Sequence, residues 1–141
     1  MPAAIDHSLV KALKGVPEFG ALDDHARLAI VGASATLFWP AGSLIFEKGS
    51  PAEALYIVLE GRVRIFEPRD DGEVEVAEMG PGDFFGELAL LLEGVRSKSA
   101  QAIEDVELMV ILKSAFDELL ARDPDLKTQV RRKFDERLPA R

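Results

Sequence analysis

The segment Arg62–Met79 reads "RVRIFEPRDDGEVEVAEM" and determines how the middle of the chain folds. Apolar residues alternate with arginines in its first half and with glutamates in its second, which is the period-two pattern of half-buried strands. Asp71-Gly72 stands between the two halves and is a strong signal for a tight hairpin turn. The segment therefore predicts two antiparallel strands with one apolar face, formed by Val63, Ile65, Val74 and Val76.

The same kind of pattern extends over residues 35–112. Glycines recur at short intervals, and short apolar runs such as "SLIFEKG" and "ALYIVLEG" lie between them. Many short strands at even spacing predict an antiparallel barrel, sandwich or roll. We find no linker or internal repeat, so residues 1–141 are expected to form a single domain.

Helical patterns flank the strand region, over residues 1–34 and 113–138. Asp23 is predicted as the N-cap of a helix that ends at Gly32. Ser114 is predicted to cap the first C-terminal helix, and Pro124 to open the second, after Asp123.

Composition excludes several classes of function. The chain has no cysteine, so disulfides, iron–sulfur clusters and zinc–thiolate sites are ruled out, and its 2 histidines, His7 and His25, lie outside the strand region. The formal net charge of −8 gives no basic face for nucleic acid; the basic run "KTQVRRKFDER" is interpreted as a solvated helical face. No apolar run is long enough to cross a bilayer and the start lacks a secretory pattern, so we expect a cytoplasmic protein, with no membrane contact by this chain alone.

The stretch Phe84–Ala100, "FFGELALLLEGVRSKSA", is unusual within the strand region. Gly86 followed by good helix formers predicts a sharp turn and one short helical turn, whose free backbone N–H groups can bind a phosphate. Arg96 can reach the same phosphate, and Glu87 can accept hydrogen bonds from sugar hydroxyls. A nucleotide monophosphate fits these groups. Taken singly, however, Gly86 can be a plain turn residue, Glu87 a first-turn helix residue, and Arg96 its surface salt-bridge partner.

The order and interval of these residues resemble the phosphate-binding cassette of cyclic nucleotide-binding domains. The matching residues are Phe85-Gly86-Glu87-Leu88-Ala89-Leu90, followed by Arg96-Ser97, within a predicted cassette at 84–99. "ALYIVLEGRVRIF" and "MGPGDFFGE" also resemble family segments, and the likeness runs from about Pro17 to Phe134. The resemblance implies an antiparallel β-roll, jelly-roll-like, with N-terminal helices and C-terminal lid helices.

The resemblance also implies a role for each matching residue. The amides of Gly86, Leu88 and Ala89 would line the phosphate and ribose pocket, and Glu87 would bind the ribose 2′-hydroxyl. Arg96 would bind the exocyclic phosphate oxygen, with Ser97 adding a hydroxyl. The apolar wall beside the base would be Ile45, Ile65, Val76 and Met79, which can equally be ordinary core. Candidates for the lid over the base are Val130, Arg131 and Phe134.

Two positions depart from the family pattern. Val95 stands where proline is common, and Lys98 stands where alanine usually packs against the phosphate. Lys98 can bring a second positive charge, crowd the pocket, or turn its head to solvent, and we expect the last of these.

The expected function is that of a non-catalytic regulatory domain that binds cAMP or cGMP and changes the conformation of its C-terminal helices. No cofactor beyond this regulatory ligand is expected. The alternative is a degenerate roll that has lost its ligand and acts as a protein-interaction module. An enzyme is not expected, because a catalyst would need an acid–base pair or nucleophile beside the pocket, and only carboxylates are available. The sequence does not choose between cAMP and cGMP, or identify the effector, and a homodimer is possible.

Overall fold

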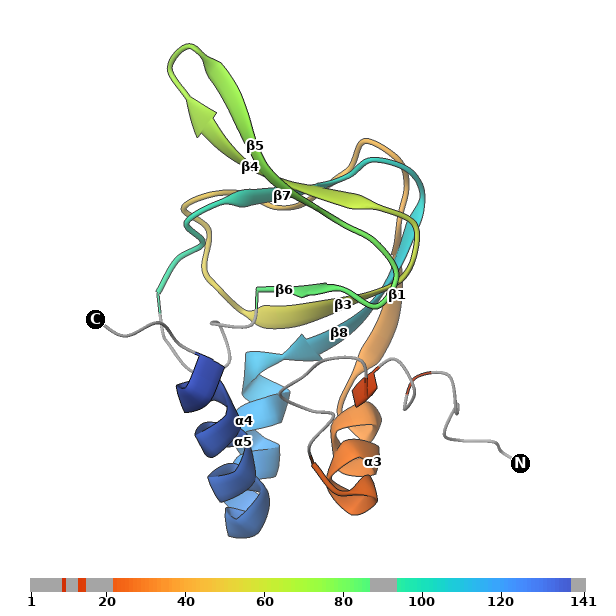
Figure 1. Ribbon diagram of the computed structural model, residues 1–141, viewed down its shortest axis with the longest axis vertical. Helices are drawn as coiled ribbons and strands as arrows, with labels where there is room; N and C mark the ends of the chain where they lie inside the picture. The colour runs from red at the N-terminus through yellow and green to blue at the C-terminus, as the bar shows by residue number, and fades with distance from the viewer. Residues whose placement is uncertain (1–8, 10–12, 15–21, 87–93, 138–141) are drawn as a thin grey trace.

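The hairpin predicted around Asp71-Gly72 is present in the computed structural model, which describes residues 9, 13–14, 22–86 and 94–137. It joins β4 (Val63–Arg69) to β5 (Gly72–Met79), with Arg69 paired to Gly72 at the turn. Figure 1 shows this hairpin projecting beyond the rest of the strands. The other strands among the described residues are short, as their spacing predicted: β1 (Ala35–Trp39), β2 (Leu44–Phe46), β3 (Ala54–Glu60), β6 (Phe84–Phe85), β7 (Ser99–Ala102) and β8 (Val106–Leu112).

These strands form two four-stranded antiparallel sheets that face each other as a roll (Figure 1). The strand order is β1-β8-β3-β6 in the first sheet and β2-β7-β4-β5 in the second. Small and branched residues fill the space between the sheets, including Val58, Val63, Ala100 and Leu108. The predicted fold class, an antiparallel β-roll with flanking helices, is therefore confirmed.

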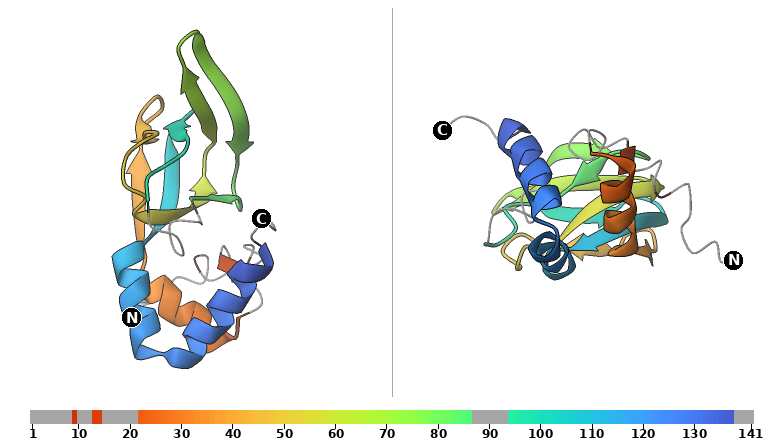
Figure 2. Two further views of the ribbon diagram at one scale, coloured as in Figure 1. Left: turned by 90° about the vertical axis from the view of Figure 1, so that its left-hand side faces the viewer. Right: turned by 90° about the horizontal axis from the view of Figure 1, so that it is seen from below.

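The helices cover the outer face of the first sheet, as the side and bottom views show (Figure 2). They are α3 (Asp24–Gly32), α4 (Lys113–Arg122) and α5 (Pro124–Arg137). A second apolar core lies between these helices and the sheet, with Ile30, Ile57, Phe116 and Leu126 almost wholly buried. Among the residues described, none belongs to a helix that is both long and apolar enough to cross a membrane.

Two of the three predicted helix starts are confirmed. Asp23 is the N-cap of α3, where its Oδ1 accepts a hydrogen bond from the Ala26 amide at 2.8 Å. Pro124 begins α5, and the Asp123 carboxylate accepts from the Leu126 amide at 3.1 Å. The earlier helical segment, before residue 22, falls largely outside the described residues.

The predicted cap at Ser114 is wrong. Helix α4 begins at Lys113, directly after β8, and Leu112 in the cap position makes no side-chain cap hydrogen bond. The Lys113 amide instead donates to the Glu53 carbonyl at 2.7 Å. The neighbouring strand segment thus satisfies a free N–H group of the helix that a side-chain cap would otherwise bind.

The prediction that Val74 and Val76 share the buried face with Val63 and Ile65 is also wrong. Val74 is 41% exposed and Val76 is 52% exposed. For Val76 the cause is a β-bulge, because Ile65 pairs with Ala77 while the next residue, Phe66, pairs with Glu75. Val76 is the extra residue without a partner, so the period-two pattern of β5 changes face at this point. Val74 pairs with Glu67 near the turn of the hairpin, which projects beyond the other strands (Figure 1).

Candidate functional site

Arg96 is held in place by backbone pairing of its own segment. Its amide donates to the Ser50 carbonyl and its carbonyl accepts from the Gly49 amide, both at 2.8 Å. The Ala52 amide donates to the Gly94 carbonyl at 3.0 Å, and Val95 forms an isolated bridge with Pro51. The segment 94–96 is therefore attached to the loop between β2 and β3, which sets the direction of the arginine side chain.

The Arg96 guanidinium lies inside the roll. The residue is only 7% exposed, so it is not a surface salt-bridge partner. Its Nη2 donates to the Ala54 carbonyl at 2.7 Å. Its Nε is buried and has no hydrogen-bond partner among the residues that the structure describes. A buried arginine with an unused donor is unusual, because buried polar groups are nearly always hydrogen-bonded.

Gly86 meets this guanidinium at the end of β6. A Cβ atom added to Gly86 would lie 2.7 Å from Arg96 Nη1 and 3.1 Å from the Ala54 carbonyl oxygen. Gly86 also has a φ of 79°, in the left-handed region that favours glycine. The structure thus brings Gly86 and Arg96 together, as the sequence predicted, and a side chain at position 86 would require the guanidinium to move.

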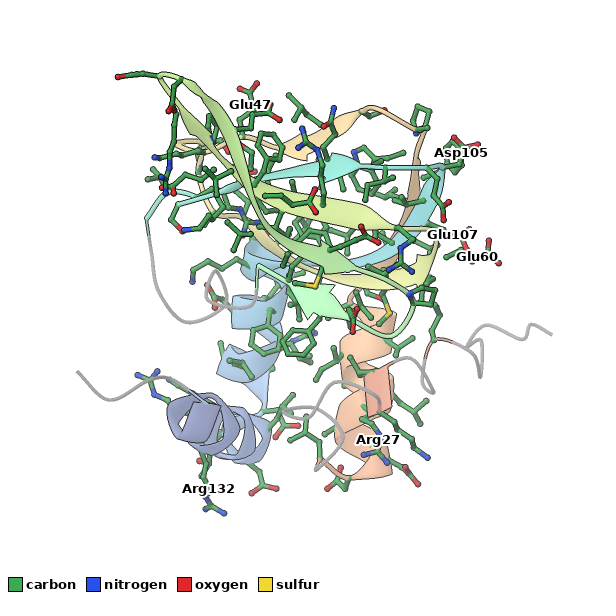
Figure 3. The ribbon with its side chains drawn as sticks, turned by 45° about the horizontal axis from the view of Figure 1, so that its top comes forward. Arg27, Glu47, Glu60, Asp105, Glu107 and Arg132 are labelled. Atoms are coloured by element: carbon green, nitrogen blue, oxygen red, sulfur yellow. The ribbon has the colours of Figure 1, made fainter. Side chains whose placement is uncertain are left out.

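Several predicted site residues lie outside the described part of the chain. Glu87, Leu88 and Ala89 fall in the undescribed segment 87–93, and with them the predicted short helical turn. In α5 the side chains of Val130 and Phe134 are likewise outside it, whereas Arg131 is exposed. The exposed Lys127, Thr128, Arg131 and Arg132 agree with a solvated helical face, and Figure 3 shows Arg132 pointing away from the sheets.

The two residues that follow the arginine differ in exposure. Ser97 is exposed, and Lys98 is half-buried. Glu67 is hydrogen-bonded to Arg69, which lowers the pKa of its carboxyl, and the nearby charges of Lys48 and Lys98 lower it further. Lys98 therefore contributes to the positive surroundings of this carboxylate of β4.

The predicted apolar wall is only partly assembled. Ile65 is buried between the sheets, and Ile45 and Met79 pack against the same core. Val76 is not part of this wall because of the bulge in β5. The packing of the other three residues is what either an apolar pocket wall or an ordinary core would show.

Sequence reasoning gave no role to the aromatic residues around Arg96. The guanidinium carbon lies 4.1 Å from the centre of the Phe46 ring and 5.6 Å from that of Tyr56. The alternation of β3 was the available signal for Tyr56, because it shares a strand face with the buried Ala54 and Val58. Nothing in the sequence pattern marked Phe46.

Burial also changes the acid–base properties of this pair. Burial lowers the pKa of Arg96 from its ordinary value, and the charge and hydrogen bond of the neighbouring Tyr56 oppose that change. Burial raises the pKa of Tyr56 above 10.0, and the positive charge of Arg96 opposes it. At neutral pH the site therefore presents a cation beside a neutral phenol.

Comparison with known proteins agrees with this geometry. Residues 36–123, more than half of the chain, match the family described as cyclic nucleotide-binding domain. The chain is 40% identical over 114 residues to the cyclic AMP receptor protein of Thermus thermophilus, covering 79% of this chain and 52% of that protein. It thus spans about half the length of this relative.

Two solved structures extend the likeness to the fold. One is the N-terminal domain of a transcriptional regulator from Streptomyces coelicolor, with a TM-score of 0.84 and 29% identity over 89% of each chain. The other is the regulatory domain of Toxoplasma gondii PKA with cAMP, with a TM-score of 0.75 and 27% identity, covering 80% of this chain and 43% of that one.

Proposed function

The chain belongs to the cyclic nucleotide-binding domain family, and on that premise we propose that it binds cAMP or cGMP as a regulatory ligand. The observation that carries the proposal is the buried Arg96 guanidinium beside Gly86, with a donor left unpaired among the described residues. A buried cation with unused N–H groups is suited to one anionic phosphate. Glu87 would bind the ribose 2′-hydroxyl, and the amides of Gly86, Leu88 and Ala89 would complete the phosphate pocket.

We also propose that ligand binding changes the position of the C-terminal helices. Arg96 is hydrogen-bonded to the carbonyl of Ala54, and Ala54 pairs with Leu112, the residue directly before α4. A ligand that shifts the guanidinium can therefore act on the start of α4 through two successive contacts, that of Arg96 with Ala54 and that of Ala54 with Leu112. Val130, Arg131 and Phe134 remain the candidates for a lid over the base. Such a switch requires that the ligand prefer one of two states.

Lys98 is the feature that favours the ligand-free alternative, because a long side chain there can crowd the phosphate. The residue is half-buried, and its charge contributes to lowering the pKa of Glu67 on β4. The family's regulatory character supports a binding domain without catalysis, and its effector would be another protein or a further domain.

Calorimetric titration of Arg96→Ala with cAMP and with cGMP tests the proposal. Loss of charged hydrogen bonds is expected to weaken binding about 100-fold, or about 2.7 kcal/mol. Arg69→Ala is the matched control, because it removes the same charge from an exposed position in the β4–β5 hairpin. Affinity should be unchanged in the control. An unchanged dissociation constant in Arg96→Ala would remove the arginine from the binding site.

A further inference from the structure

We propose that Phe46 and Tyr56 are positioning residues, which hold the Arg96 guanidinium by its face so that its N–H edge stays available to an anion. This inference rests on the proposed function, because it assigns the two rings a role in the same phosphate site. The ring centres lie 4.1 Å and 5.6 Å from the guanidinium carbon, within the range of cation–π attraction.

The argument begins with the cost of burying a positive charge. Burial lowers the pKa of Arg96, which shows that its cation is poorly solvated inside the roll. A buried charge is usually stabilised by an ion pair. Among the described residues, no carboxylate forms an ion pair with Arg96, although pairs are found for Arg62, Arg64 and Arg69.

Aromatic faces stabilise the cation in a way that suits an anion site. A carboxylate partner would occupy the N–H donors of the guanidinium and would have to be displaced by phosphate. A ring face attracts the charge through its quadrupole and takes up no donor. Among the described residues, the Ala54 carbonyl accepts from Nη2 and the Tyr56 side chain also hydrogen-bonds the guanidinium, whereas Nε is unpaired.

Neighbouring aromatic residues fix the two rings in turn. The Tyr56 ring stacks on Phe85 at 5.2 Å and meets the edge of Trp39 at 6.2 Å. Phe46 lies 5.7 Å from Tyr56 and 6.0 Å from Phe85. We call Trp39, Phe46, Tyr56 and Phe85 the aromatic cluster.

Phe46 reaches this cluster through an irregularity in β2. Leu44 pairs with the half-buried Gln101, whereas Phe46 pairs with the wholly buried Ala100. The register shift between them turns Phe46 toward the roll interior while Leu44 stays 45% exposed. The second sheet thereby contributes a ring to a cluster whose other members lie in the first.

The test is a titration of Phe46→Leu, which keeps an apolar side chain but removes the ring. Binding of cAMP is expected to weaken about tenfold, since a desolvated cation–π contact is worth roughly 1–2 kcal/mol. Phe46→Tyr, which keeps a ring face, should stay within about twofold of the unmodified protein. Phe66→Leu is the matched control, because the Arg64 guanidinium carbon lies 4.0 Å from the Phe66 ring centre in a similar contact. The affinity of this variant for cAMP should not change.

Combination with Arg96→Ala separates positioning from mere packing. If Phe46 acts through the arginine, Phe46→Leu should change cAMP affinity less than about twofold once Arg96 is absent. An equal loss in both backgrounds would overturn the proposal.

A second measurement needs no ligand, so it keeps this inference distinct from the proposed function. The chain has 1 tyrosine, so the absorbance of its phenolate on alkaline titration reports Tyr56 alone. Arg96 opposes the burial-induced rise in the pKa of Tyr56. In Phe46→Leu the guanidinium should move away from Tyr56, which should raise the midpoint of the phenolate titration. Arg96→Ala should raise this midpoint as well. An unchanged midpoint in Phe46→Leu would refute the positioning role, whereas failure of the unmodified protein to bind either nucleotide would refute the proposed function.

Discussion

At the scale of single residues, Arg96 combines features that rarely occur together. It is 7% exposed, its pKa is lowered by burial, and its Nε has no partner among the described residues. Leaving a buried donor unpaired costs roughly 1–3 kcal/mol. Such a cost is typical of sites where a ligand completes the hydrogen bonds. Stability and binding are thus opposed at this residue.

Gly86 gives a prediction at the same scale. In Gly86→Ala the new methyl group would meet Arg96 Nη1 at 2.7 Å, and its φ of 79° is unfavourable for alanine by about 1–2 kcal/mol. Because the arginine must move away, we expect cAMP affinity to fall at least about tenfold in calorimetric titration.

Gly72→Ala is the control for backbone strain. Gly72 has a φ of 132° and open space around its added Cβ atom, so the variant should lose stability and keep its affinity. A comparable loss of cAMP affinity in both variants would contradict the assignment of Gly86 to the site.

At the scale of elements, local signals predicted most of the secondary structure. The Asp71-Gly72 hairpin, the Asp23 cap and the Pro124 start depend on residues close in sequence, and all three are confirmed. The Ser114 cap and the burial of Val76 were wrong for one reason. Each was decided by which backbone groups pair, and the residue pattern does not specify that pairing. The Lys113 amide pairs with the Glu53 carbonyl, and the pairing of β5 with β4 shifts at the bulge beside Val76.

The proposed movement of the C-terminal helices gives a prediction for α5. If a nucleotide draws this helix over the base, backbone amides in residues 124–137 should exchange hydrogen more slowly when cAMP is bound. The tip of the β4–β5 hairpin, which projects away from the roll (Figure 1), should show no change. Exchange in α5 that is the same with and without bound cAMP would argue against a lid, even if the nucleotide binds.

At the scale of the whole molecule, local sequence patterns predicted only part of the candidate site. The spacing of Gly86 and Arg96 predicted that they would meet, and the structure places them together. The aromatic cluster was not predicted, because Phe46 belongs to one sheet and Tyr56 to the other. Their meeting requires the closed roll and the register shift in β2, neither of which any local pattern encodes.

Stability of the whole domain also tests whether the ligand is retained. A nucleotide present at about 100 times its dissociation constant should stabilise the fold by about 2.7 kcal/mol, seen as a rise of several degrees in Tm. Arg96→Ala at the same nucleotide concentration should show a much smaller rise. Melting that is indifferent to both cAMP and cGMP would support the ligand-free interaction module.

The edge contact between Trp39 and Tyr56 has a practical consequence. Each is the single residue of its type in the chain, and their ring centres are 6.2 Å apart. At such a separation the excitation energy of the phenol is transferred efficiently to the indole, so the emission of Trp39 depends on the surroundings of both rings. Because Tyr56 also borders Arg96, Trp39 emission from the unlabelled protein offers a test of whether an added nucleotide reaches Arg96.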